Sequence, residues 1–368
     1  MHVRSDETGV DPAGGAQSVR VGIVGASGYS GEELVRLLLG HPLARLSVVT
    51  SRQYAGRTVA AVFPRFAGAP RARELVFSDP AVEGLARDCE VVFLALPHGV
   101  AAEFAAPLLE AGCRVIDLSA DFRLRSAEVY REFYQHDHPA PGLLEDAVYG
   151  LPEVYREAIV KARLVASPGC YPTSILLPLI PLLRAGLVRP TGIIANSLSG
   201  VSGAGRKAEI PLLFVECNES LRPYGVPKHR HLSEIEQELS RAAGEAVTLQ
   251  FTPHLVPVNR GILTTLYVDP VRTPADVTDG EALLEAVAKA CDAAYGASPF
   301  VRVLGGSGLP DTKNVVGTNC LEFAWRLDPR TRRLLVMSAE DNLVKGASGQ
   351  AVQSLNLMCG FPETAGLV

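Results

Sequence analysis

The feature that most constrains the fold of this chain is a strand, a glycine-rich turn and a helix encoded in succession near residue 20. Residues 20–25 form a β-branched apolar run, and residues 32–39 repeat leucines at helical spacing before Gly40. Glycines between them let a backbone approach a pyrophosphate, and the helix N-terminus supplies N–H donors and positive potential. The pattern predicts a dinucleotide-binding turn. The residues assigned to the cofactor there are Gly25, Ser27, Gly28, Tyr29, Ser30 and Gly31.

The end of the next apolar run indicates which dinucleotide binds. Residues 46–50 read as a strand that ends in Ser51 and Arg52. An NAD enzyme usually carries an acid here that holds the ribose 2′-hydroxyl. A hydroxyl and an arginine suit a 2′-phosphate, so we predict NADP(H). The glycine spacing is GxxGxxG and not GxGxxG, so a glycine-rich turn without a cofactor stays open as an alternative.

Further strand-like runs follow at βαβ spacing. Residues 90–96 and 114–118 are separated by a helical stretch over 100–111, which predicts a parallel, doubly wound sheet. Ligands bind beyond the carboxyl ends of such strands, where His98 and Arg123 should lie. We assign His98 to the cofactor, with a role as a base as the alternative, and Arg123 to the substrate.

Cys170 is the candidate nucleophile. It follows an apolar run at 164–166 and opens a long apolar segment at 174–183, with Pro168 and Gly169 before it. A cysteine at such a strand-to-helix junction meets free N–H groups and the positive end of the helix dipole, which favour a thiolate. A small buried packing residue is the alternative.

Two segments downstream carry the remaining candidate chemistry. The small-residue loop 199–205 ends in Arg206 and Lys207, a possible cradle for a carboxylate or phosphate, or else a flexible exposed loop. His229 and His231 stand at the start of a helix, and either can act as general acid and base, with Glu234 one turn on to orient His231. No third ligand has metal-site spacing, so we predict no metal.

Length and composition set the class of protein. At 368 residues the chain suggests two domains, and a net charge of -5 disfavours nucleic acid as a partner. No apolar run reaches the roughly 20 residues that span a bilayer. Seven scattered cysteines without a signal peptide indicate the reducing cytoplasm. We expect a disordered tail at 1–18, a nucleotide domain at 19–168 with 339–368, and a substrate and oligomerisation domain at 169–338.

Together, a dinucleotide domain, a thiol, a histidine and an anion cradle predict an NADP-linked semialdehyde or acyl-phosphate reductase. At this level of detail the sequence resembles the N-acetyl-γ-glutamyl-phosphate reductase family over residues 19–368. Eight ordered motifs carry the resemblance, at 25–34, 93–99, 117–123, 149–153, 168–173, 199–206, 228–231 and 345–351.

The resemblance implies reduction of N-acetyl-L-glutamyl 5-phosphate by NADPH to the 5-semialdehyde and phosphate, the third step of arginine biosynthesis. It implies Cys170 as nucleophile and the 229–231 pair as acid and base, with His231 favoured. On the same motifs we assign Ser199, Gly200 and Gln350 to the cofactor. It further implies a Rossmann-type domain plus an α+β domain, as in aspartate-semialdehyde and glyceraldehyde-phosphate dehydrogenases, and a homo-oligomer, usually a tetramer.

Two other functions are weighed against this one. A lysine-pathway reductase acts on the one-carbon-longer aminoadipyl phosphate carried on an acidic protein, and a methylene discriminates by only about 1–3 kcal/mol. No obvious basic docking cluster is present, which favours the free acetylated substrate. A non-catalytic NADP-binding sensor would not need Cys170 or the cations at 206 and 207.

Overall fold

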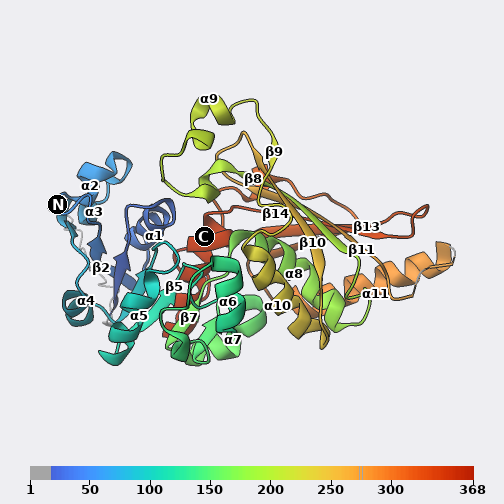
Figure 1. The fold of residues 1–368 in the computed structure, drawn as a ribbon, viewed down its shortest axis with the longest axis horizontal. Helices are drawn as coiled ribbons and strands as arrows, with labels where there is room; N and C mark the ends of the chain where they lie inside the picture. Colours follow the sequence, from blue (N-terminus) through green and yellow to red (C-terminus); the bar gives the residue numbers. More distant parts are fainter. Residues whose placement is uncertain (1–17, 273, 276) are drawn as a thin grey trace, which may run out of the picture.

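The structure is a computed structural model that describes residues 18–272, 274–275 and 277–368, and it is built around two seven-stranded sheets (Figure 1). The tail expected at 1–18 falls, except for Ser18, outside the described residues. No helix in the described part of the chain is long and apolar enough to cross a membrane.

The first sheet is entirely parallel and occupies the N-terminal part of the chain. Its strand order is β3-β2-β1-β4-β5-β7-β6. The strands are β1 (Val19–Val24), β2 (Ala44–Thr50), β3 (Phe77–Ser78), β4 (Val91–Leu94), β5 (Arg114–Asp117), β6 (Ala147–Tyr149) and β7 (Leu164–Ala166). Strand β4 and the last four residues of β1 are apolar and buried because helices cover both faces, as parallel sheets require.

Helices connect these strands. The longer ones are α1 (Tyr29–Leu39), α4 (Val82–Asp88), α5 (Ala101–Glu110), α6 (Ala127–Tyr134) and α7 (Pro152–Lys161), with short turns at α2 (Val59–Val62), η1 (Pro64–Phe66), α3 (Pro70–Glu74) and η2 (Pro141–Leu143). Helix α1 ends at Leu39 and is capped by Gly40, where the sequence predicts its end.

The second sheet is mixed and follows in the chain. Its order is β12-β13-β14-β11-β8-β10-β9, with β10 parallel to β8, β12 parallel to β13, and antiparallel pairs elsewhere. The strands are β8 (Ile193–Gly200), β9 (Arg222–Pro223), β10 (Leu249–Val256), β11 (Ile262–Val268), β12 (Val301–Gly305), β13 (Leu321–Leu327) and β14 (Leu334–Glu340).

Three long helices accompany this sheet: α8 (Cys170–Arg184), α10 (His231–Ala243) and α11 (Val277–Tyr295). Helix α8 is buried along nearly its whole length, and its leucines and isoleucines join β11, β13 and β14 in one apolar core. The remaining short elements are η3 (Val201–Ala204), η4 (Ile210–Leu212), α9 (Phe214–Cys217) and α12 (Thr312–Val315).

The C-terminal segment returns to the first sheet, as the sequence predicts. After β14 the chain forms a π-helical turn, η5 (Val344–Ser348), and then α13 (Gly349–Cys359), which packs in one core with β1, β2 and α1. Within this return the Lys345 ammonium, fully buried, donates to Glu153 on α7 at 2.7 Å. An ion pair buried this deeply holds the segment in place, since either charge alone would be costly there.

The fold class expected from the sequence is confirmed: a Rossmann-type doubly wound sheet is joined to a second α+β unit. The expected strands at 90–96 and 114–118 are present as β4 and β5, which are shorter than expected by three residues and by one residue. The sequence analysis missed β12, the helices α6 and α7, and the short elements before β3.

Candidate active site

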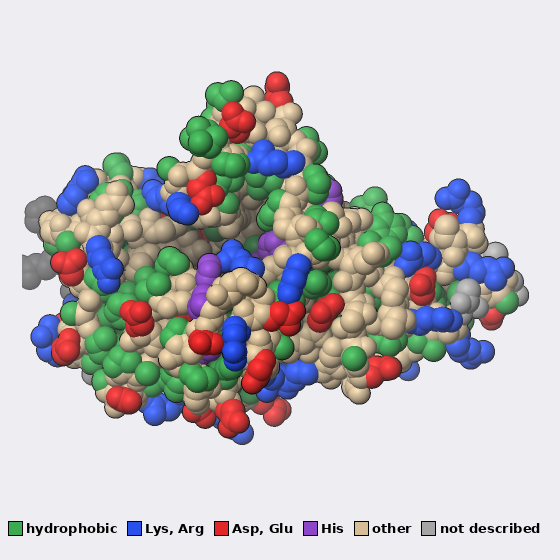
Figure 2. Space-filling model, in the orientation of Figure 1, with side chains coloured by type: hydrophobic (Ala, Val, Ile, Leu, Met, Phe, Trp, Pro, Cys, Tyr) green, Lys and Arg blue, Asp and Glu red, His purple; other side chains and the backbone are tan. Residues whose placement is uncertain are grey.

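A cavity of about 650 Å³ lies where the carboxyl ends of the first sheet meet the start of α8 and the η3 loop. Figure 2 shows the molecule hollowed between the N-terminal part and the projection that carries α9, with basic and histidine side chains nearby. The residues that line the cavity include Gly28, Tyr29, Ser30, Gly31, His98, Arg123, Gly169, Cys170, Arg206, Lys207, Arg230, His231, Asn342 and Gly346.

The glycine turn has the geometry that a dinucleotide needs. Gly25 has φ +83°, and a Cβ there would lie 2.3 Å from the Ala95 carbonyl oxygen. A Cβ on Gly31 would lie 2.3 Å from the Gly25 oxygen, so neither position accepts a side chain. Gly28 caps α1, and the first N–H groups of that helix have no acceptor within the helix. The turn therefore fits a pyrophosphate.

Residues 51–56, which follow β2 directly, contain no aspartate or glutamate. The Ser27 and Ser51 hydroxyls are 2.9 Å apart, and Arg52 is exposed beside them in the sequence. Ser27, Ser51 and Arg52 are not among the residues that line the cavity. Ser51 and Arg52 follow the end of β2 next to the glycine turn, where the ribose of a dinucleotide would extend.

Cys170 is the first residue of α8 and is partly open to the cavity. It has almost no space behind it, because a Cβ on Gly346 would lie 2.8 Å from the Cys170 Cβ. The same Cβ would lie 2.9 Å from Oε1 of Glu340, the last residue of β14, so only a glycine separates that carboxyl from the nucleophile.

The resting protonation state of Cys170 differs from the sequence prediction of a thiolate. Burial and then Glu340 raise the pKa of Cys170 to about 12, and the Tyr171 N–H only partly opposes them. The thiol is therefore neutral before substrate binds, and attack on a substrate requires a base that takes its proton.

The structure distinguishes the two histidines that the sequence left open. His231, at the start of α10, lines the cavity together with Cys170, whereas His229 is not among the residues that line it. His229 packs among Tyr171, Tyr224 and Phe251 behind the site. Burial, followed by His229, lowers the pKa of His231 well below its ordinary value, so its imidazole is neutral and can accept a proton.

Glu234 has different partners from the one the sequence suggested. Its Oε1 accepts from the Gly169 N–H at 2.8 Å and from the Tyr149 hydroxyl at 2.7 Å, and its Oε2 lies 3.4 Å from Arg123. The buried Nδ1 of His231 has no hydrogen-bond partner in the described structure. Glu234 therefore does not orient His231; it fixes the backbone just before the nucleophile.

The three cations assigned to the substrate, Arg123, Arg206 and Lys207, differ in burial and in their partners. The buried Arg123 guanidinium donates to the carbonyls of Ser167 and Leu118 at 2.7 and 2.9 Å, which orders the loop before Cys170. Arg206 pairs with Glu32 on α1 and stacks over Tyr29 at 4.7 Å, and Lys207 pairs with Glu209 at the exposed rim. Arg206 thus joins the η3 loop to the glycine turn.

Three other residues assigned to the cofactor, Ser199, Gly200 and Gln350, pack behind the cavity and, like Gly25, Ser27, Ser51 and Arg52, are not among its lining residues. Ser199 is buried and donates to the Gly200 carbonyl, and Gly200 packs against the Asn259 backbone. Gln350 is buried and donates to Thr173 on α8 at 2.9 Å. These residues support the wall and do not face the cavity, because the small-residue pattern alone does not distinguish a lining position from a packing position.

The sequence analysis also missed residues that the structure brings to the site. Arg230 lines the cavity and donates to His98 at 2.9 Å across its mouth. Glu340 is fully buried with neither carboxyl oxygen hydrogen-bonded. The histidine motif at 228–231 contains Arg230, but nothing local marks Glu340 as a neighbour of a cysteine 170 positions earlier in the chain.

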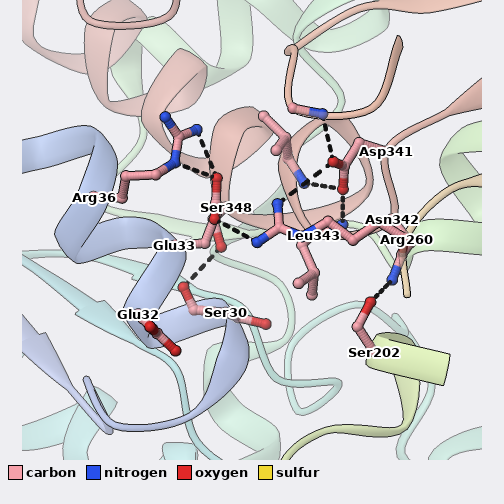
Figure 3. A network of polar contacts seen from close by, with 12 residues as sticks. Ser30, Glu32, Glu33, Arg36, Ser202, Arg260, Asp341, Asn342, Leu343 and Ser348 are labelled. Atoms are coloured by element: carbon pink, nitrogen blue, oxygen red, sulfur yellow. Dashed lines mark hydrogen bonds and ion pairs between the residues drawn. The ribbon is translucent and has the colours of Figure 1, made fainter. Parts of the chain in front are cut away.

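A polar network behind the cavity joins the two parts of the molecule (Figure 3). Arg260, in the loop between β10 and β11, pairs with Glu33 on α1 at 2.8 Å and with Asp341 at 3.5 Å. Asn342 donates to the Ser202 hydroxyl and accepts from the Gly261 N–H. The wall of the cavity and the helix that begins at the glycine turn are therefore held in one arrangement.

Among the described residues, no group of three or more His, Cys, Asp or Glu side chains is placed to hold a metal ion. The arrangement is a dinucleotide turn facing a thiol and a neutral imidazole. Such a site can form a covalent acyl-enzyme next to a nicotinamide.

Comparison with known families agrees with this class of site. Residues 20–162 match the NAD binding domain of semialdehyde dehydrogenases, and residues 170–342 match the semialdehyde dehydrogenase dimerisation domain. The fold is similar to that of aspartate semialdehyde dehydrogenase II from Vibrio cholerae, with a TM-score of 0.69 at 21% identity over 94% of this chain and 99% of that one. It is also similar to aspartate semialdehyde dehydrogenase with NADP from Candida albicans, with a TM-score of 0.67 at 18% identity over 93% of this chain and 98% of that one.

Sequence relatives narrow the class. The chain is 60% identical over 352 residues to N-acetyl-gamma-glutamyl-phosphate reductase of Akkermansia muciniphila, covering 95% of this chain and 99% of that protein. It is 50% identical over 354 residues to the protein of the same name from Moorella thermoacetica, covering 95% and 98%. The chain belongs to the N-acetyl-gamma-glutamyl-phosphate reductase family.

The close approach of Gly169 to His231 gives a first prediction. A Cβ on Gly169 would lie 2.5 Å from His231 Nε2, while the backbone at φ −69° and ψ 157° accepts alanine. Gly169→Ala should therefore fold but displace the imidazole from the thiol. We expect modification of Cys170 by iodoacetamide at pH 7, followed on the Cys170 peptide by mass spectrometry, to slow by about a hundredfold, within the range of general-base effects.

Gly142→Ala is the matched control for this variant, because a Cβ there meets nothing within 4 Å. Equal alkylation rates in Gly169→Ala and the parent protein would show that His231 is not the base for Cys170.

The buried Glu340 carboxyl gives a second prediction, on stability. Burial raises the pKa of Glu340 well above its ordinary value. The nearby Lys345 ammonium lowers the pKa, whereas the carboxylates of Asp341 and Glu153 raise it further. The folded state then holds a proton that the unfolded state releases, so this group makes stability fall as pH rises above about 4.3 toward the folded pKa. Glu340→Gln, which stays neutral, should remove a loss of about 1.4 kcal/mol per pH unit in that window.

Urea unfolding of the parent and Glu340→Gln at pH 5, 6.5 and 8 checks this. The difference in unfolding free energy should grow with pH in favour of Glu340→Gln. Parallel curves across this range would mean that Glu340 is ionised in the folded protein.

Proposed function

We propose that this protein catalyses the NADPH-dependent reduction of N-acetyl-L-glutamyl 5-phosphate to N-acetyl-L-glutamate 5-semialdehyde and phosphate, the third step of arginine biosynthesis. The single observation that carries the proposal is one cavity lined by the glycine turn, Cys170 and His231. The relatives named for this reaction cover nearly the whole chain and support the choice of substrate.

The first half of the reaction follows from the protonation states of the two side chains. His231 takes the proton of the Cys170 thiol as the sulfur attacks the acyl carbon, which avoids a free thiolate in a buried site beside Glu340. His231 then gives that proton to the departing phosphate, and a thioester is left on Cys170. The free N–H groups of the first turn of α8 favour negative charge on the reacting carbonyl oxygen.

The second half needs the cofactor. A cofactor held at the glycine turn would supply hydride chemistry at the carbon that Cys170 carries. The chain's own task is to hold that carbon at Cys170, to exclude water, and to reprotonate the sulfur as the aldehyde leaves. Arg123 and Glu234 contribute by fixing the loop 167–169 on which this geometry depends. The Nδ1 atom of His229 accepts a hydrogen bond from the backbone N–H of His231 at 3.2 Å, which fixes the chain at the start of α10.

The proposal includes NADP(H) as the cofactor. The residues that would hold it are the glycine turn at 25–31, Ser51 and Arg52, together with His98, which lines the cavity. The absence of an acid at the end of β2 supports NADP over NAD. Arg206, Lys207 and Arg230 are the cations available to the substrate's phosphate and carboxylate at the cavity.

Three further expectations belong to the proposal. The chain divides into a nucleotide domain at 19–168 with 339–368 and a substrate domain at 169–338, which the membership of the two sheets supports. The protein is a homo-oligomer, supported by the match to a dimerisation domain. It works in the cytoplasm, and its seven free cysteines are consistent with a reducing compartment.

A direct assay tests the reaction. Purified protein with NADP⁺, phosphate and N-acetylglutamate semialdehyde should form NADPH, and Cys170→Ser should lower kcat by at least about a thousandfold, as expected for loss of a nucleophile. Cys113→Ser, at a buried cysteine of the first sheet, is the matched control.

Turnover only with the longer, carrier-linked aminoadipyl substrate would instead assign the chain to lysine synthesis. Binding of NADP without turnover of either substrate would indicate a sensor.

The cofactor choice has a separate test. Arg52→Ala should weaken NADP⁺ binding by roughly tenfold or more, the value of a charge-assisted hydrogen bond, while NAD⁺ binding stays unchanged. Arg45→Ala removes an exposed arginine at the opposite end of β2 and should affect neither cofactor. Equal loss for NADP⁺ and NAD⁺, measured by calorimetry, would remove Arg52 from the 2′-phosphate site.

A further inference from the structure

A second cavity, of about 560 Å³, lies at the amino end of the first sheet and shares no lining residue with the active-site cavity. The last turns of α5 and α7 line it, and β7 begins in it at Leu164. The active site lies beyond the opposite, carboxyl end of the same strand, at 167–170. The second cavity is therefore a separate site, which the proposed reaction does not use.

The lining of the second cavity combines an aliphatic floor with a charged rim. Four of its lining residues are charged, and all the others are alanine, leucine or valine. Ala162 and Leu164 are buried, and Leu109 and Leu143 are partly buried. A mostly apolar cavity of this size with a few polar groups around it is typical of sites for small molecules.

The charged side chains of the rim are free to meet a ligand. Those of Glu110, Asp146 and Lys161 have neither a hydrogen bond nor an ion pair with any other residue that the structure describes. The Arg163 guanidinium donates from one nitrogen to the Leu109 carbonyl at the end of α5, and its other N–H groups have no acceptor among the described residues. The rim thus offers two carboxylates and two cations.

The charge of the second cavity favours a ligand that carries more positive than negative groups. The carboxylates of Glu110 and Asp146 equal the cations of Lys161 and Arg163 in number. Both α5 and α7 end at the cavity, and each helix C-terminus adds roughly half a negative charge. The sum is negative, so the complementary molecule has two cationic groups and one carboxylate.

We propose that the second cavity binds a free α-amino acid with a cationic side chain. The carboxylate of this ligand pairs with Lys161 and Arg163, where charge-assisted hydrogen bonds are strong. Its two cationic groups meet Glu110 and Asp146, and its aliphatic stem covers the alanine and leucine floor. An amino acid with an aliphatic side chain lacks the second cation, and a diamine leaves the two cations of the rim unpaired.

Calorimetric titration of the full chain with three probes tests the chemistry of the ligand. L-lysine should bind at least about tenfold more tightly than L-norleucine, which lacks the side-chain ammonium, because a charge-assisted contact is lost. It should exceed cadaverine, the diamine without the carboxylate, by a similar factor. Equal affinity for L-lysine and either of the other probes, or no saturable binding of L-lysine up to about 10 mM, overturns the proposal.

A pair of double variants tests whether binding occurs in this cavity. Glu110→Gln with Asp146→Asn keeps the size of both side chains and removes their charge, so the affinity for L-lysine should fall by at least about tenfold. The matched control is Glu103→Gln with Glu145→Gln, since Glu103 lies at the start of α5 and Glu145 precedes Asp146, and neither lines the cavity.

Thermal unfolding without ligand should be the same for both double variants and the parent, since all four carboxylates are exposed. Unchanged affinity in the Glu110 and Asp146 variant, or an equal loss in the control, overturns the site. These measurements use binding and stability alone, so they do not depend on the proposed reaction.

Discussion

The ion pairs of Arg260 join the two halves of this molecule. Glu33 lies on the helix that follows the glycine turn, and Asp341 follows the last strand of the second sheet, and both carboxylates are almost completely buried. A buried carboxylate is tolerated only with a partner, and Arg260 partners both, while Arg36 on α1 also pairs with Glu33. These contacts tie the helix that follows the glycine turn, and the segment after β14, to the loop between β10 and β11.

In the proposed reaction, the two side chains that exchange a proton, Cys170 and His231, are both neutral at rest. Burial opposes the thiolate of Cys170 and the imidazolium of His231 alike. Charge then appears only when a substrate arrives, because the proton passes from sulfur to nitrogen as the new bond forms. A thiol held in this state is protected from oxidation between turnovers, since oxidants react with the thiolate.

The glycine turn and the position of Cys170 could be predicted from the sequence because the patterns that specify them are local. The glycines at 25, 28 and 31 and the strand-to-helix junction at Cys170 depend on a few adjacent residues, and the structure has both elements there. The partners of Glu234 could not be predicted in the same way. Spacing along α10 suggested His231, yet the carboxylate meets Gly169 and Tyr149, which are distant in the sequence. The position of Glu340 beside Cys170 could not be predicted from the sequence either, because it depends on how β14 packs against α8.

The two glycines around the nucleophile have a chemical consequence. Gly169 adjoins the imidazole and Gly346 adjoins the Cys170 Cβ, each closer than a methyl group allows. Cys170 is consequently backed by the Gly346 backbone and borders the cavity on its other side. A reagent that reaches this thiol through the cavity must fit the cavity, so its shape as well as its intrinsic reactivity governs how fast it labels the cysteine.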